Sequence, residues 1–241
     1  MTKAGLISLA TALVLAAGLV SCKKKQPAPA PMSAQAAPAE TVGAAGLAPL
    51  MLQLPKPLFV GTPTDIPVPN LEKPLGKARP PLLVPAGATT NLALRRPVSS
   101  SDPYPIIGEL SLATDGDKEG TDGSWVELGW GRQYVQIDLG QPHVLFAIVV
   151  WHYHRQARAY HDVVVQVSDD PDFVTGVTTV FNNDYDNSSG LGLGQDRPYV
   201  ETAEGKLIPL KGVRARYVRL YSKGNTSDGQ NHYTEVEVYG K

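Results

Sequence analysis

The sequence has a single cysteine, Cys22, among 241 residues. A fold held together by disulfides is therefore excluded, because one such bond needs two thiols. Long amphipathic runs with apolar residues at helical spacing are also missing. Short β-type runs separated by glycine- and asparagine-rich turns take their place, so the sequence favours an all-β protein.

Motifs of common enzymes and of nucleic-acid binders are missing as well. The chain has no Gly-x-Ser-x-Gly elbow, no phosphate-binding loop and no dinucleotide fingerprint. Its formal net charge is -1 and no basic stripe is present, which argues against nucleic acid as a partner. We therefore expect neither an enzyme nor a nucleic-acid binder.

The first residues have the features of an export signal. Lys3 precedes a nearly continuous apolar run, Ala4–Val20, which ends at Leu19-Val20-Ser21-Cys22. This ending resembles the lipobox of bacterial lipoproteins, in which the cysteine is acylated and becomes the first residue after cleavage. The resemblance implies a signal peptide over residues 1–21 and a lipid anchor on Cys22 in a membrane of the bacterial cell envelope. A plain transmembrane anchor is the alternative, but the run is short for a span.

Residues 22–88 differ in composition from the rest of the chain. Fourteen of the 21 prolines lie here, whereas tyrosine and tryptophan are absent. Such a segment cannot bury enough apolar surface for a core of its own, so we expect an extended, polyproline-like stalk. Large apolar residues alternate with prolines over 54–63 and 80–85, which is typical of an arm lying along a domain surface.

All ten tyrosines and all three tryptophans follow Thr89, so residues 89–241 are the expected folded domain. The β-type runs within it are 91–98, 134–139, 144–153, 163–168, 177–181, 206–210, 215–221 and 232–239. About eight antiparallel strands predict a two-sheet sandwich of jelly-roll type.

The most strand-like stretch is Gln133–His154. Apolar and polar residues alternate over 134–139, which predicts a half-buried strand. Every residue over 144–151 is apolar, which predicts a central buried strand, and Gly140-Gln141-Pro142 predicts a turn between the two. A polar and aromatic loop, His152–His161, follows directly.

Six motifs occur in order along this domain: Asn91-Leu-Ala, Ala113-Thr-Asp-Gly-Asp, Tyr134-Val-Gln-Ile-Asp-Leu-Gly, Val165-Gln-Val-Ser-Asp-Asp, Ala215-Arg-Tyr-Val-Arg-Leu-Tyr and Glu235-Val-Glu-Val-Tyr-Gly. The series resembles the discoidin, or coagulation factor type C, fold. That galactose-binding-like jelly roll is shared with family-32 carbohydrate-binding modules and fucose lectins. The resemblance covers residues 89–241 and implies a non-catalytic module that binds sugar, phospholipid or protein.

Oxygen donors are dense between Asp115 and Trp125, where glycines turn the chain, and this pattern suits calcium. An EF-hand is disfavoured because its twelfth position is Val126 and strand-like segments flank the loop. The resemblance implies a structural calcium ion and its ligands. They are Leu112 through its carbonyl, Asp115, Asp117, Thr121 or Ser124, and Glu235.

The loop His152–His161 and its neighbour at 125–132 carry the candidate ligand contacts. Sugar recognition needs an aromatic face for the C–H side of the ring and donors for its hydroxyls. The predicted contacts are His152, His154, Arg155, Arg158, Tyr160, Trp130 and Arg132. Tyr153 and Trp125 are further candidates, and Asn182–Gly194 is the candidate second rim loop.

The sequence thus predicts a tethered, non-catalytic module whose most favoured ligand is carbohydrate. Two alternatives stay open. One is an adhesive envelope protein whose domain binds a protein partner. The other is a metalloenzyme in which His152, His154 and His161 hold zinc or copper, although no cysteine assists and arginines lie beside them.

Overall fold

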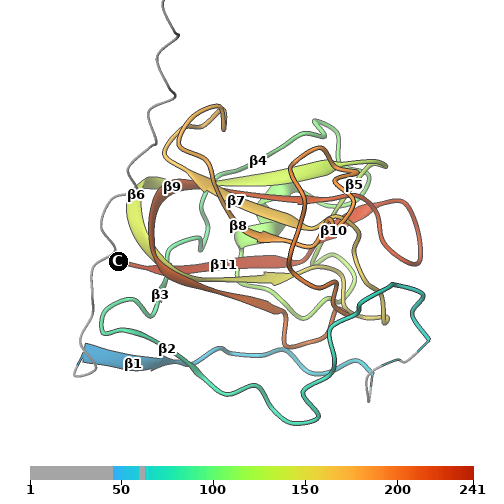
Figure 1. The fold of residues 1–241 in the computed structure, drawn as a ribbon, viewed down its shortest axis with the longest axis horizontal. Coiled ribbons are helices and arrows are strands. Elements are labelled where there is room, and N and C mark those ends of the chain that lie inside the picture. Colours follow the sequence, from blue (N-terminus) through green and yellow to red (C-terminus); the bar gives the residue numbers. More distant parts are fainter. Residues whose placement is uncertain (1–45, 60–62, 64) are drawn as a thin grey trace, which may run out of the picture. The chain divides into compact units, whose positions relative to one another are not determined.

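The computed structural model describes residues 46–59, 63 and 65–241 of the chain (Figure 1). The predicted signal peptide, Cys22 and the first part of the stalk lie outside the described residues. Among the residues described, a short 3-10 helix, η2 (Leu110–Thr114), interrupts a chain of strands and loops. Within that same part, no helix combines the length and the apolar character that crossing a membrane requires.

The strands of the described residues are β1 (Leu47–Leu50), β2 (Leu82–Pro85), β3 (Thr90–Asn91), β4 (Val98–Ser100), β5 (Val126–Leu128), β6 (Gln133–Trp151), β7 (Val164–Ser168), β8 (Thr178–Asn182), β9 (Lys206–Ser222), β10 (Asn231–Tyr233) and β11 (Glu235–Gly240). The main sheet has the order β3-β11-β6-β9-β7-β8, with β4 beside β6. Two smaller pairs, β1 with β2 and β5 with β10, complete the set. All of these pairings are antiparallel, which confirms the predicted all-β sandwich.

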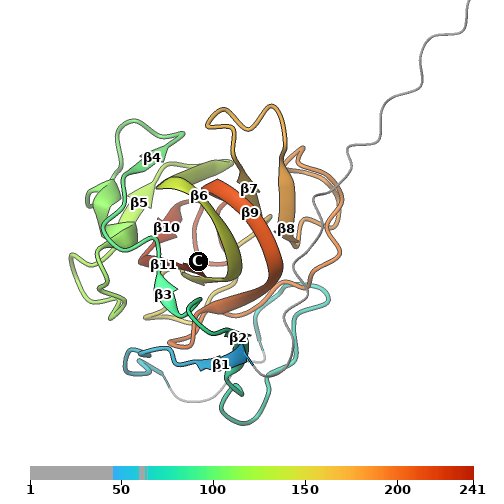
Figure 2. The ribbon, with the colours of Figure 1, turned by 90° about the vertical axis from the view of Figure 1, so that its left-hand side faces the viewer.

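The two strands predicted at 134–139 and 144–153 are one long strand, β6. The predicted turn at Gly140-Gln141-Pro142 is instead a bulge, because the partners on β9 shift from Tyr217 opposite Asp138 to Ala215 opposite His143. The runs 206–210 and 215–221 are likewise a single strand, β9. A bulge bends a strand without ending the pairing, and Figure 2 shows β6 and β9 curving together.

Because β6 bends, both of its halves face one core. Val135 and Ile137 from the first half and Ile148 and Val150 from the second belong to the same buried cluster. The alternation over 134–139 therefore reflects a half-buried strand, as predicted, with the apolar side chains pointing inward.

The second half of β6 is apolar on its other face as well, and the arm covers that face. Ala147, Val149 and Trp151 form a separate buried cluster with Leu50 of β1 and Val84 of β2. Burial on both faces explains why the sequence shows no alternation over 144–151. The arm expected from the proline-rich stretches is thus packed on the sandwich.

Polar contacts fix the arm further along its length. Arg79 donates to the carbonyl oxygens of Gly205 and Glu204 at 2.9 and 2.7 Å. The main-chain amide of Glu72 donates to the carbonyl of Pro198 at 2.7 Å. These bonds join the arm to the segment that leads into β9.

Trp151 and Trp130 provide a matched test of this packing. Trp151 is fully buried, its Nε1 donates to the Ala203 carbonyl at 3.0 Å, and Gly205 approaches its ring so closely that a Cβ there would lie 2.6 Å away. We expect Trp151→Ala to lower the free energy of unfolding by about 3–5 kcal/mol. Trp130 is 73% exposed, so Trp130→Ala should change the free energy of unfolding by no more than about 0.5 kcal/mol. Urea unfolding curves that shift equally for the two variants would contradict this packing.

Candidate functional site

Four loops interlock beside the short β5–β10 pair. They are the 129–132 loop before β6, the 152–163 loop after it, the 183–195 loop after β8 and the 223–230 loop after β9. Asn231 joins two of them, since its Nδ2 donates to the carbonyls of Gly129 and Gly131 at 2.7 and 3.0 Å and its Oδ1 accepts from the amide of Gly224 at 2.8 Å. Lys223 bonds the Ser188 carbonyl at 3.0 Å.

A buried polar network lies beneath these loops. The side chains of His152 and Glu201 are both fully buried, and His152 Nδ1 lies 2.6 Å from Glu201 Oε1. The imidazole stacks on the ring of Tyr160 at 4.3 Å between centroids. The Tyr160 hydroxyl bonds His232 Nδ1 at 2.8 Å, and His232 Nε2 lies 3.2 Å from Glu127 Oε2. The network therefore runs from the β8–β9 segment to β5.

Burial sets the ionisation of this network. Removal from water lowers the pKa of His232 to about 4 and raises the pKa of Tyr160 well above its ordinary value. Burial raises the pKa of Glu127, and the negative charge of Asp228 raises that pKa further by a smaller amount. At neutral pH His232 is thus neutral, accepting from the Tyr160 hydroxyl and donating to Glu127.

Most of the predicted ligand contacts on the 152–163 loop lie under the surface. His152, His154, Arg158 and Tyr160 are all buried. His154 Nε2 donates to the Lys118 carbonyl at 2.9 Å, which ties this loop to the predicted calcium loop. The expected projecting loop is instead folded onto the sandwich, and these side chains position their neighbours.

Arg158 shows how this positioning works. Its guanidinium lies over the Tyr153 ring at 4.6 Å and donates to Asp228 Oδ2 at 3.1 Å. Tyr153 in turn packs edge-on against Trp125 at 4.9 Å. The buried Arg158 cation thus holds an exposed carboxylate of the 223–230 loop in place.

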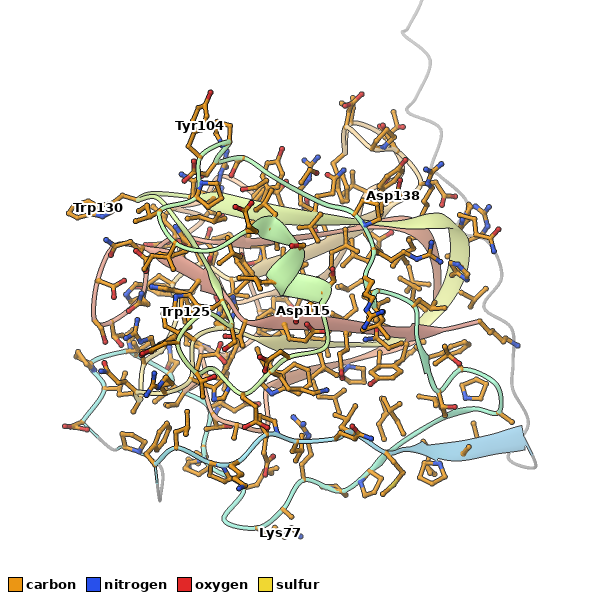
Figure 3. The ribbon with its side chains drawn as sticks, turned by 180° about the vertical axis from the view of Figure 1, so that it is seen from behind. Lys77, Tyr104, Asp115, Trp125, Trp130 and Asp138 are labelled. Carbon is orange, nitrogen blue, oxygen red and sulfur yellow. The ribbon has the colours of Figure 1, made fainter. Side chains whose placement is uncertain are left out.

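The exposed part of the site is a rim, which we define as Trp130, Arg132, Asp228 and Gln230. The indole of Trp130 lies against Gly229, where a Cβ would come within 3.2 Å of the ring. Its Nε1 donates to the Gln230 amide oxygen at 3.1 Å when that amide is oriented as its neighbours require. Arg132 donates to the Ser189 carbonyl. Figure 3 shows Trp130 projecting from the edge of the molecule.

Arg155 lies apart from the rim contacts. It is exposed and donates to Asp122 Oδ1 at 2.5 Å, on the predicted calcium loop. Sequence reasoning missed Asp228, Gln230 and Glu201, because each lies in a segment that reads as an ordinary turn and gains its role only from contacts with distant residues.

The predicted second rim loop, Asn182–Gly194, folds around Asp184. Its carboxylate accepts from the main-chain amides of Ser188 and Ser189 at 3.0 and 2.9 Å. Asp184, Asp162 and Asp186 are the one group of three ligating side chains close enough for a metal ion within the described part of the chain. The Lys223 ammonium lies 3.6 Å from Asp162 Oδ2, so a lysine side chain already supplies positive charge to this acidic group. His152, His154 and His161 do not form such a group within the described part of the chain.

The loop that carries Asp115 contacts β11, the strand that begins with Glu235. The amide of Gly116, next to Asp115, donates to Glu235 Oε2 at 3.1 Å. Glu235 is fully buried, its Oε1 has no partner among the described residues, and burial raises its pKa to about 9. An orphaned buried carboxylate oxygen beside Asp115 fits a cation, which would supply the missing partner.

The other predicted ligands hold the loop in shape. Asp115 accepts from the amide of Asp117 at 2.8 Å, and Asp117 accepts from the amide of Glu119 at 2.9 Å. The buried Ser124 hydroxyl donates to the Thr121 carbonyl at 2.7 Å. Leu112 lies in η2, immediately before this loop.

Solved structures with a similar fold include three sugar-binding modules. A chitosan-binding module of a Paenibacillus sp. IK-5 chitosanase/glucanase is 24% identical, with 62% of this chain and 98% of that chain covered and a TM-score of 0.46. A Streptococcus pneumoniae fucose-binding module is 21% identical, with 63% and 98% covered and a TM-score of 0.43. The CBM32 of AlyQ, solved with 4,5-unsaturated mannuronic acid, is 18% identical, with 59% and 92% covered and a TM-score of 0.43.

At these identities the likeness concerns the fold. No protein-family model matches the chain, and no curated protein matches it.

The buried network predicts a specific pH dependence of stability. Unfolded His232 takes up a proton near pH 6.5, whereas the folded protein resists this until about pH 4. The unfolded state therefore binds more protons than the folded state between these pH values. The stability that the folded protein gains from keeping His232 neutral is complete above pH 6.5 and is lost as the pH falls toward 4. In His232→Gln the free energy of unfolding should fall less steeply over that range. Carboxylates titrate in both proteins, so identical slopes in urea titrations from pH 7 to pH 4 would refute the assignment.

Proposed function

We propose that the domain is a non-catalytic module that binds carbohydrate at the rim. The observation that carries this proposal is Trp130, a large aromatic side chain that is 73% exposed yet fixed by Gly229 and Gln230. An aromatic face held in water in one orientation suits the apolar C–H face of a sugar ring, because little side-chain freedom is lost on binding.

Polar groups beside the indole supply the complementary hydrogen bonds. Asp228 Oδ1 accepts from Asn225 Nδ2 at 2.6 Å and from the main-chain amide of Gln230 at 3.1 Å, and Oδ2 accepts from Arg158 at 3.1 Å. The second lone pair of Oδ2 is therefore left, in a fixed orientation, for a ligand hydroxyl. Arg132 has further N–H groups beyond the one on Ser189. Donors and acceptors thus flank one aromatic face, which is the combination that sugar hydroxyls need.

Trp130→Ala and Arg132→Gln test this proposal. Loss of a charged donor costs about 1.5–3 kcal/mol, so Arg132→Gln should weaken binding roughly tenfold to a hundredfold, and Trp130→Ala should abolish the stacking contact. Glycan-array screening of the full chain, followed by calorimetric titration of the best ligand, measures both effects. Tyr104→Ala is the matched control, because Tyr104 is 84% exposed but outside the rim.

Unchanged affinity in both rim variants would move the site elsewhere. If the array retains no sugar and a specific envelope protein co-purifies with the chain, the adhesive alternative holds and the glycan proposal fails.

We also propose that calcium binds at Glu235 and Asp115 and stabilises the Asp115–Trp125 loop against β11. Since the ion would partner the orphaned Glu235 oxygen, chelation should lower the melting temperature of the wild type. Asp115→Ala should abolish that difference. Asp186→Ala, in the separate acidic group, should keep it. A wild-type melting curve that does not respond to a chelator would rule out the ion.

The lipobox resemblance supports a further proposal, that Cys22 carries a lipid which tethers the module to the bacterial envelope. Two or three acyl chains would hold it firmly, because each buried methylene contributes about 0.8 kcal/mol. Cys22→Ser should therefore lose metabolic labelling with a radioactive fatty acid. Labelling equal to that of the wild type would exclude lipidation at this position, and no second cysteine can substitute.

A further inference from the structure

A cleft of about 470 Å³ lies between the arm and the sandwich, away from the rim. Its walls are arm residues 57–59 and 72–79, together with residues on the 199–207 segment that leads into β9. This volume is within the range of small-ligand sites and holds one or two sugar rings. In Figure 3 Lys77, on the arm, and Trp130, on the rim, are at separate edges of the molecule. We call this space the arm cleft.

The arm cleft has an excess of positive charge. Four basic side chains, Lys73, Lys77, Arg79 and Lys206, line it against two acidic ones, Glu72 and Glu204, which leaves two positive charges in excess. Lys206 is paired, since its Nζ lies 2.7 Å from Glu72 Oε2.

The remaining cations have no carboxylate in contact. Arg79 uses two N–H groups on the carbonyls of Gly205 and Glu204, so its charge is oriented without a contact ion pair. Lys73 and Lys77 are exposed, and neither forms an ion pair with any residue of the described ranges.

Apolar side chains form another part of the wall. Leu58 and Leu75 are 41% and 60% exposed, and both line the cleft. A fitting ligand therefore has an anionic group for the cations and a compact body with an apolar face for the leucines.

We propose that the arm cleft is a second ligand site that takes an acidic sugar residue of a glycan, with the acid group facing Lys73, Lys77 and Arg79. This site is independent of the rim. A cleft of this volume admits a sugar ring between its walls, next to the half-buried Arg79, whereas a flat bilayer surface would contact only the exposed Lys73 and Lys77. The geometry thus favours an acidic glycan over an anionic membrane.

Calorimetric titration of the full chain with a short oligogalacturonate tests the proposal. A neutral oligosaccharide of the same length is the ligand control. We expect binding of the acidic oligomer that weakens as salt is raised from 0.05 to 0.5 M, on the order of tenfold or more, because the contacts are partly exposed charges. Lys73→Gln combined with Lys77→Gln should reduce the affinity at low salt roughly tenfold.

The double variant leaves the arm's own hydrogen bonds intact, so its melting temperature should equal that of the wild type. Arg95→Gln combined with Lys211→Gln removes the same charge from exposed positions outside the cleft, and its affinity should stay unchanged. Trp130→Ala should also bind the acidic oligomer normally, which separates this site from the rim.

Three results would overturn the proposal. They are no binding of the acidic oligomer by the wild type, equal affinity in the lysine double variant, and equal loss in Trp130→Ala. Adsorption to phosphatidylglycerol vesicles without oligomer binding would assign the cations to a membrane instead. Amide NMR shifts on titration give a second readout, since they should cluster over 72–79 and 199–207.

Discussion

The burial of the second half of β6 on both faces is the constraint on which the rest of the structure depends. Ile148 and Val150 point into the sandwich core, whereas Val149 and Trp151 point into the cluster that the arm covers. A strand paired with β11 and β9 and covered on both sides cannot shift its register without exposing one apolar face. The strand therefore ends at a fixed point, Trp151, and fixes where the next residues begin.

Those next residues are polar, and their buried hydrogen bonds fix the loops relative to the end of β6. His152 binds Glu201, and Tyr160 binds His232, so the loop after β6 is joined to the β8–β9 segment and to β10. His152 and Glu201 bond each other through one atom each, whereas His152 Nε2 and Glu201 Oε2 have no partner among the described residues. A different arrangement of these loops would also break the bonds that are made, and leaving a buried donor or acceptor unpaired is costly. The rim is exposed, but the network beneath it is not, and this combination keeps Trp130 and Asp228 in place.

The sequence was informative where periodicity or composition decides the structure. The alternation over 134–139 and the apolar run over 144–151 predicted the core strands, and the proline-rich stretches predicted an arm. The bulge at Gly140-Gln141-Pro142 was mistaken for a turn, because the same breaking residues suit both and only the pairing with β9 distinguishes them. The burial of Arg158 and His152 was not foreseen, since it depends on Asp228 and Glu201, which are remote in sequence.

The central claim is that a sugar stacks on Trp130. The chain has three tryptophans, so its indole N–H resonances form a small set in a ¹H–¹⁵N spectrum. Titration with an oligosaccharide retained on the array should shift the Trp130 indole resonance and leave that of the buried Trp151 unchanged. A saturating sugar that leaves the Trp130 resonance in place would contradict the account.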